Sequence, residues 1–274
     1  MQAGRFLVFA AHPDDADICF GGTAVRLIRA GHVVKFVSMT NGDCGHYEMS
    51  GAVLAERRRR EAEASRAVAG LAEYEICDIR DGQLELTVEN RSRIVRIIRN
   101  FAPDVVLTHR TCDYHVDHRT TAQLVMDAAY LIRVPLFCPD TPIPEKSPIF
   151  AHMYDPFVDP RPFRPDVMVP IDQVLDEKCR MIDCHVSQIY EWLAWERHLE
   201  VDLKNWTWEQ RKEYILKNWL DRNINAADLG RERLIADLGE AGRQVRYAEA
   251  FEWSPYGGRI SGDEAALREL LTAQ

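Results

Sequence analysis

The chain has 274 residues, of which 46% are hydrophobic and 28% are charged. That is enough apolar material for a sizeable core, in the proportion typical of globular proteins. The formal net charge of −9 argues against a nucleic-acid-binding surface, which needs massed Lys and Arg. We therefore expect the partner to be a small molecule or another protein.

The cysteines indicate a reducing compartment. There are seven, an odd number, scattered along the chain without a C-x-x-C pair, which is unlike a disulfide framework or a structural zinc site. The first apolar run is too short for a signal peptide, and no stretch of 18 apolar residues could cross a membrane. We expect a cytoplasmic protein.

From residue 5 to residue 132, short β-rich runs alternate with helical patterns. The predicted strands are 5–10, 33–39, 74–79 and 104–109. The predicted helices between them carry apolar stripes, namely Ala64, Ala67, Val68 and Leu71, then Ile94, Val95, Ile98 and Phe101, then Leu124, Val125, Ala128 and Ile132. This order predicts an α/β fold with a mostly parallel sheet flanked by helices. Ligands bind beyond the carboxyl ends of such strands, so the segments to search are 10–17, 40–47, 80–83 and 109–118.

The second half is less regular. Residues 135–170 are rich in proline, which excludes long helices around a further predicted strand at 149–154. A long helix is predicted from about 172 to 200, and Thr207 with Gln210 forms a capping-box start for another. We expect a catalytic domain over 1–200 and a helical C-terminal extension over 201–274 packed on it, together forming one structural domain. The extension is also a candidate surface for a homo-oligomer.

Two polar clusters follow predicted strands. His12, Asp14 and Asp15 come after the first strand, and a second cluster follows the fourth: His109, Asp113, His115, Asp117 and His118. A catalytic zinc needs three His or carboxylate ligands and an open position for water. His12, one of Asp14 and Asp15, and one of His115 and His118 would supply them. A carboxylate that does not ligate can then take a proton from water whose pKa the metal lowers to about 7.

A simpler explanation of each cluster is helix capping, since Asp at a strand end often caps the next helix. For one cluster we would favour capping. Two clusters at the same edge of a sheet favour a metal site, because gathered carboxylates repel one another and need a cation.

Four consecutive arginines, 57–60, lie among glutamates in a predicted helix. Consecutive residues of a helix point in different directions, so we expect most of these side chains to be solvated at the surface. Arg60 differs, because it shares a helical stripe with Ala64, Ala67 and Leu71. We predict that Arg60 binds substrate.

Two other enzyme classes lack their motifs. The sequence contains no G-x-G-x-x-G for a dinucleotide and no G-x-S-x-G for a serine hydrolase.

The segment "AHPDDADICFGGT" (residues 11–23), followed by "HVDH" (115–118), resembles the PIG-L/LmbE-like family of zinc-dependent N-acetylglucosaminyl deacetylases, which have a Rossmann-like fold. Further matches are "TNGDCG" (40–45), "REAEASRAVAG" (60–70), "DGQL" (81–84), "PDVVLTH" (103–109) and "HVSQ" (185–188).

The resemblance implies a role for each matching residue. His12, Asp15 and His118 would ligate one Zn²⁺, or another divalent metal, per chain, and Asp14 would be the general base. His115 would stabilise the oxyanion, Asp117 would orient or tune His115, and Arg60 would contact the substrate.

The implied reaction is removal of an N-acetyl group from an N-acetylglucosamine-type sugar or conjugate. Two alternatives stay open. One is an amidase of the same chemistry that acts on a larger thiol conjugate or antibiotic-like amide. The other is a binding protein that keeps the fold without catalysis.

Overall fold

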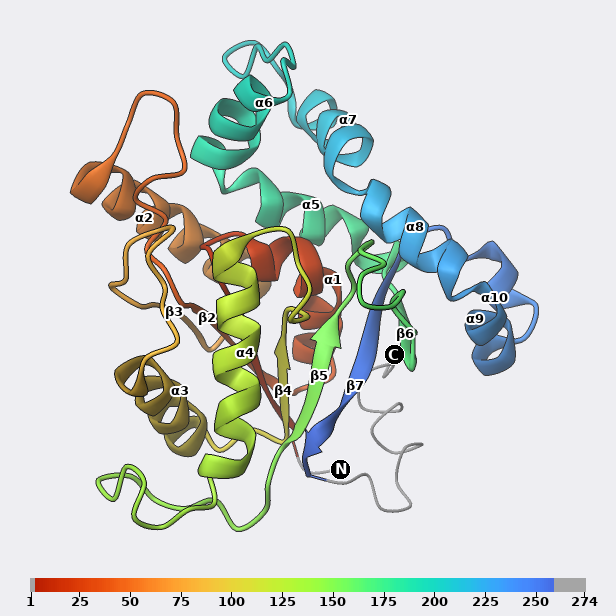
Figure 1. Cartoon of the computed structure of the whole chain (residues 1–274). Coiled ribbons are helices and arrows are strands. Elements are labelled where there is room, and N and C mark those ends of the chain that lie inside the picture. The colour runs from red at the N-terminus through yellow and green to blue at the C-terminus, as the bar shows by residue number, and fades with distance from the viewer. Residues whose placement is uncertain (1–2, 259–274) are drawn as a thin grey trace.

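The computed structural model describes residues 3–258, which form a seven-stranded sheet with helices on both faces (Figure 1). The strand order is β3-β2-β1-β4-β5-β7-β6. The strands are β1 (Arg5–Ala10), β2 (Val33–Ser38), β3 (Glu73–Ile76), β4 (Val105–Thr108), β5 (Ile149–Met153), β6 (Val167–Pro170) and β7 (Ala248–Gly257). The first five are parallel, and β7 runs antiparallel to both β5 and β6. The α/β class and the five predicted strands are confirmed.

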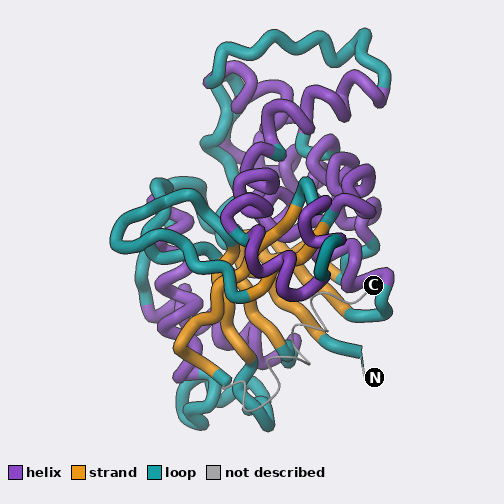
Figure 2. The backbone as a smooth tube through the Cα atoms, turned by 90° about the vertical axis from the view of Figure 1, so that its right-hand side faces the viewer, coloured by secondary structure: helices purple, strands orange, loops and turns teal. Residues whose placement is uncertain are grey.

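The central strands are apolar throughout because both of their faces are covered. In β1, Phe6, Val8 and Ala10 belong to one buried cluster, and Leu7 and Phe9 belong to another on the opposite face. Helices α1 (Asp15–Arg29) and α5 (Leu175–Asp183) pack on the first cluster, and α3 (Val88–Phe101) and α4 (Val116–Leu131) pack on the second. Figure 2 shows the strands as one twisted layer between these helices.

The expected long helix over 172–200 is interrupted, and this prediction was wrong. A 3-10 turn (Asp172–Val174) precedes α5, and a π-helical segment (Ser187–Trp192) separates α5 from α6 (Leu193–Glu196). The backbone N–H of Ser187 donates to Glu61 Oε1 (2.8 Å), on α2 (Gly51–Ala69), rather than to a helix carbonyl. A bond to a neighbouring helix therefore replaces a helical one at the break.

The rest of the C-terminal region consists of four helices and a strand within the described residues. The helices are α7 (Trp208–Trp219), α8 (Asp221–Leu229), α9 (Arg231–Leu238) and α10 (Ala241–Gln244). The capping box of Thr207 and Gln210 is confirmed at the start of α7. Strand β7 then enters the central sheet between β5 and β6, which the sequence analysis did not anticipate. Residues 259–274 of the expected extension lie outside the described part, and the division at residue 200 stays a prediction.

Helices α5 to α8 lie across the carboxyl ends of the parallel strands, at the top of Figure 1. They cover the edge of the sheet at which the two polar clusters lie. None of the helices within residues 3–258 combines the length and the apolar character needed to span a bilayer.

Candidate active site

The two polar clusters meet in one cavity of about 560 Å³. His12, Asp14 and Asp15 follow β1, and His115 and His118 lie at the start of α4. Segments 40–47 and 80–83, which follow β2 and β3, also contribute to its wall. All four segments selected from the sequence thus reach the same cavity.

Three side-chain atoms form a nearly equilateral triangle. His12 Nδ1 lies 3.2 Å from Asp15 Oδ2, His118 Nε2 lies 3.3 Å from the same oxygen, and the two nitrogens are 3.3 Å apart. Zinc bonds of about 2.0–2.1 Å in a tetrahedron place ligand atoms roughly 3.3–3.4 Å from one another. The triangle therefore fits one tetrahedral metal ion, and all three of its residues line the cavity.

The charges around this triangle favour a cation. Burial lowers the pKa of His118, but Asp15 and Asp113 outweigh it and raise the value to about 9. Burial likewise opposes protonation of His12, and Asp15, Asp117 and Asp81 nevertheless raise its pKa well above the usual value. The carboxylates thus create a field that holds positive charge, which suits a divalent metal.

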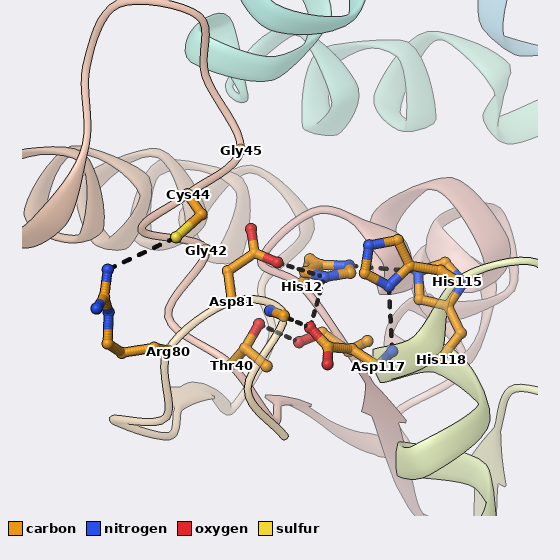
Figure 3. Close-up of polar contacts among 12 residues, drawn as sticks. His12, Thr40, Gly42, Cys44, Gly45, Arg80, Asp81, His115, Asp117 and His118 are labelled. Atoms are coloured by element: carbon orange, nitrogen blue, oxygen red, sulfur yellow. Dashed lines mark hydrogen bonds and ion pairs between the residues drawn. The ribbon is translucent and has the colours of Figure 1, made fainter. Parts of the chain in front are cut away.

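Each histidine of the triangle turns its second ring nitrogen toward a carboxylate. His118 Nδ1 lies 3.0 Å from Asp113 Oδ1. His12 Nε2 lies 3.2 Å from Asp81 Oδ1 and 3.4 Å from Asp117 Oδ2 (Figure 3). Such partners fix the ring orientation and tautomer of metal-binding histidines. Asp81 and Asp113 fall in the segments searched from the sequence, but their roles were not predicted.

His115 caps a helix and also lines the cavity. It is the N-cap of α4, and its Nδ1 accepts the backbone N–H of Asp117 (3.1 Å). Burial, with His12 and His118 nearby, lowers the pKa of His115. The neutral ring therefore carries its proton on Nε2, where it can donate.

The carboxylate of Asp117 lies against His12 and accepts the N–H of Gly82 (2.6 Å). The resemblance implies that Asp117 orients or tunes His115. In the structure only its backbone N–H does so, and the side chain supports His12.

His109 packs against one of the proposed metal ligands. Its ring stacks on His118 with centroids 4.1 Å apart, and its Nε2 accepts the N–H of Ala11 (3.2 Å). Burial and the His118 charge lower the pKa of His109 to about 4. It is therefore neutral, with one nitrogen already engaged by the backbone.

Asp14 is free of the capping role that the simpler explanation assigns to such residues. It is the N-cap of α1, but its side chain makes no capping hydrogen bond. Its Oδ1 instead accepts from Arg58 Nη2 (3.0 Å), and both side chains are buried beside the cavity. Burial raises the pKa of Asp14, and Arg58 acts in the opposite direction.

The structure does not bring Arg60 to the cavity. Its side chain is 77% exposed and bonds to Glu56 (2.9 Å), whereas the side chain of Arg58 is 2% exposed. The expected apolar stripe on this helix was wrong, since Ala64 and Ala67 face solvent. The buried face of α2 includes polar residues, namely Arg58, Glu61 and Ser65.

A second polar layer lies behind the site. Asp17 is fully buried, accepts hydrogen bonds from Ser65 and Tyr74, and lies 3.2 Å from His185 Nε2. Gln188 donates to the Gly45 carbonyl (3.0 Å). The segment 185–188, which follows α5, therefore contacts both α1 and the loop after β2.

Comparisons with known proteins identify the family of the chain. Residues 7–129 match the family described as "PIG-L: GlcNAc-PI de-N-acetylase". Diacetylchitobiose deacetylase of Thermococcus kodakarensis is 31% identical over 206 residues, which cover 71% of this chain and 74% of that protein.

Two solved structures are similar over most of the chain. N,N'-diacetylchitobiose deacetylase from Pyrococcus horikoshii superposes with a TM-score of 0.69 at 26% identity, covering 93% of this chain and 85% of that one. The 4-carboxy-2-hydroxymuconate hydratase from Pseudomonas putida superposes with a TM-score of 0.71 at 23% identity, covering 94% and 98%. The second likeness concerns the fold alone, and it shows that this fold carries more than one chemistry. By its sequence and its structure, the chain belongs to the PIG-L family of de-N-acetylases.

Proposed function

We propose that the chain is a zinc-dependent N-deacetylase of N-acetylglucosamine-type sugars or their conjugates, and that it acts in the cytoplasm. The chain belongs to a family of deacetylases. The observation that carries the metal-dependent mechanism is the triangle of His12, Asp15 and His118 with the carboxylate of Asp14 beside it. The seven free cysteines are consistent with a reducing compartment.

His12, Asp15 and His118 would hold the metal, one per chain, as zinc or another divalent ion. The bound metal would supply Lewis acidity, which polarises the amide carbonyl and eases deprotonation of water. Asp81, Asp113 and Asp117 keep the two histidines oriented.

Asp14 is the general base of the proposed reaction. It lines the cavity next to Asp15 and does not belong to the triangle. Its carboxylate takes a proton from the attacking water as oxygen adds to the amide carbon. It then gives that proton to the leaving nitrogen as the C–N bond breaks, so that the products are acetate and the free amine.

Arg58 and His115 assist the addition of water to the amide, one at the base and the other at the carbonyl oxygen. Arg58 orients Asp14 through the 3.0 Å hydrogen bond and favours its ionised form against the effect of burial. His115 presents its Nε2–H to the cavity and donates to the oxyanion as the carbonyl oxygen gains charge.

The alternative substrates are larger amides, such as thiol conjugates or antibiotic-like molecules, cleaved by the same chemistry. A cavity of about 560 Å³ falls within the usual range for small ligands, which favours a sugar or a small conjugate.

The test is acetate release from N-acetylglucosamine and diacetylchitobiose by protein loaded with zinc, with a chelator as the control. We expect release that stops on chelation and returns with zinc. Chelator-resistant release would contradict the metal-dependent mechanism. No release from either sugar by the zinc-loaded protein would move the substrate to a larger amide.

A further inference from the structure

The cavity is lined by an arginine, Arg222, that has no carboxylate within ion-pair distance among the described residues. Four arginines line the cavity: Arg58, Arg110, Arg197 and Arg222. Arg58 pairs with Asp14 at 3.0 Å, and Arg110 pairs with Asp155 at 3.1 Å. Within residues 3–258, no carboxylate lies within 4.0 Å of the other two guanidinium groups.

Arg197 and Arg222 differ in their surroundings. Arg197 is exposed, lies 4.1 Å over the ring of Trp219, and donates to the Asn218 carbonyl (3.0 Å). Arg222 is partly buried, and its guanidinium makes one hydrogen bond with the described residues, from Nη2 to the Tyr154 carbonyl. A guanidinium has five N–H donors, so most of those of Arg222 are available to a ligand.

Among residues 3–258 no carboxylate pairs directly with the Arg222 guanidinium, although Asp15 and Glu249 act on its charge from a greater distance. The Cys19 thiol interacts with it electrostatically, but burial raises the pKa of Cys19 to about 12, so the thiol is neutral. Asp221 is exposed, and its Oδ1 accepts the backbone N–H of Arg222 (2.8 Å) instead of pairing with the side chain.

Arg222 is within reach of a molecule bound at the triangle. Asp15, Ile18 and Cys19 line the same wall of the cavity along α1. Asp15 and Cys19 are four residues apart, which is about 6 Å along a helix. Asp15 and Arg222 line the same cavity and interact electrostatically, so we place the acidic substituent of a sugar bound at Asp15 beside Arg222.

We propose that Arg222 binds an anionic substituent of the substrate, a carboxylate or a phosphate, so that the enzyme prefers acidic N-acetylated sugars to neutral ones. This inference rests on the proposed deacetylase function. The planar fork of an arginine matches the oxygens of either anion. Arg222 has no ion-pair partner among residues 3–258, and the anion of the substrate would supply one.

The experiment compares zinc-loaded wild type, Arg222→Gln, Arg222→Lys and the matched control Arg197→Gln. The neutral substrate is N-acetylglucosamine. The acidic substrates are N-acetylmuramic acid, which carries a carboxylate, and the 1- and 6-phosphates of N-acetylglucosamine. The better acidic substrate identifies which anion the site takes.

We expect wild type to favour at least one acidic substrate by about tenfold in kcat/KM. Arg222→Gln should lower the acidic-to-neutral ratio by about ten- to a hundredfold, mainly through KM, as expected for hydrogen bonds to a charged group. Arg222→Lys should restore part of the ratio, and Arg197→Gln should keep it within about twofold. Bound zinc and the melting temperature verify that each variant is folded.

Three results would overturn the assignment. The first is a wild type that shows no preference for acidic substrates, and the second is an acidic-to-neutral ratio of kcat/KM that Arg222→Gln leaves unchanged. The third is an equal loss of kcat/KM on neutral and acidic substrates, which would mean that Arg222 only supports the Tyr154 carbonyl. Calorimetric binding of glucosamine 6-phosphate and of glucosamine separates this inference from the deacetylase proposal. If no substrate releases acetate but wild type binds the phosphate sugar more tightly than Arg222→Gln does, the anion site stands and the deacetylase proposal fails. Equal binding by both proteins would contradict the anion site.

Discussion

The Arg58 guanidinium donates a hydrogen bond to Asp14 Oδ1 across 3.0 Å, and both side chains are buried beside the cavity. The same guanidinium reaches the Gly42 carbonyl (3.3 Å). Arg58 thus connects the proposed base to the loop after β2. Burial raises the pKa of Asp14, and the nearby positive charge of Arg58 offsets this effect in part.

Asp14→Asn should abolish most of the activity while the metal stays bound. The amide keeps the size of the side chain but cannot accept a proton, and general bases contribute about 10²–10⁴-fold to rate. Acetate release and zinc content, measured on the same preparation, check this prediction. Activity that survives the substitution would mean that another group is the base.

Arg58→Gln and Arg60→Gln form a matched pair on α2. We expect the first to lower kcat/KM about ten- to a hundredfold, because a buried charge-assisted hydrogen bond is worth about 1.5–3 kcal/mol. The second should stay within about twofold, since Arg60 is exposed and pairs with Glu56 at the surface. The reverse order would return the substrate-binding role to Arg60.

The pH profile should respond to Arg58 in a defined direction. A general base works when deprotonated, so kcat/KM falls as pH decreases through its pKa. Arg58 acts to lower the pKa of Asp14, against the effect of burial. Arg58→Gln should therefore raise that pKa and move the acid limb of kcat/KM to higher pH. A limb that stays in place or moves to lower pH would separate Arg58 from the ionisation of the base.

Gly42→Ala should damage both stability and activity. Gly42 has φ = 68°, and an added Cβ would collide with the Arg58 guanidinium. Gly51 has φ = 62° and open space where a Cβ would lie, so Gly51→Ala isolates the backbone strain of about 1–3 kcal/mol. The free energy of unfolding should fall in both variants, and kcat/KM should fall mainly in Gly42→Ala. Equal kcat/KM in the two would rule out displacement of Arg58.

Asp113→Asn should weaken metal binding although Asp113 is not one of the proposed ligands. Its Oδ1 lies 3.0 Å from His118 Nδ1, and loss of such a partner typically costs ten- to a hundredfold in metal affinity. Competition with a chelating dye measures the change. Asp140→Asn, which removes an exposed carboxylate paired with Arg96, is the control. Matching affinities in the two variants would exclude this role for Asp113.

Much of the site could be anticipated because its residues directly follow strands. His12, Asp15 and His118 come after β1 and β4, which are neighbours in the sheet, and the carboxyl ends of parallel strands meet at one edge. Residues that directly follow two neighbouring parallel strands are therefore close together in the fold. Their role as ligands stays a prediction that metal analysis can test.

Arg58 could not be chosen over Arg60 in the same way. The two residues point in different directions from α2, and the choice depends on which face of the helix is buried. The stripe of Ala64 and Ala67 suggested one face, but the buried face carries Arg58 and Glu61, whose partners are Asp14 and Ser187. These partners lie 44 and 126 residues away in the sequence.

The sequence by itself determined the α/β class, the parallel order of the first strands and the two polar clusters, because apolar periodicity and strand ends are local properties. Only the tertiary structure decided that Asp117 supports His12, that β7 enters the central sheet, and that Arg222 from α8 lies in the same cavity as Asp15. These facts depend on contacts between distant segments. Such contacts are selected by packing and charge compensation over the whole molecule, and no local pattern records them.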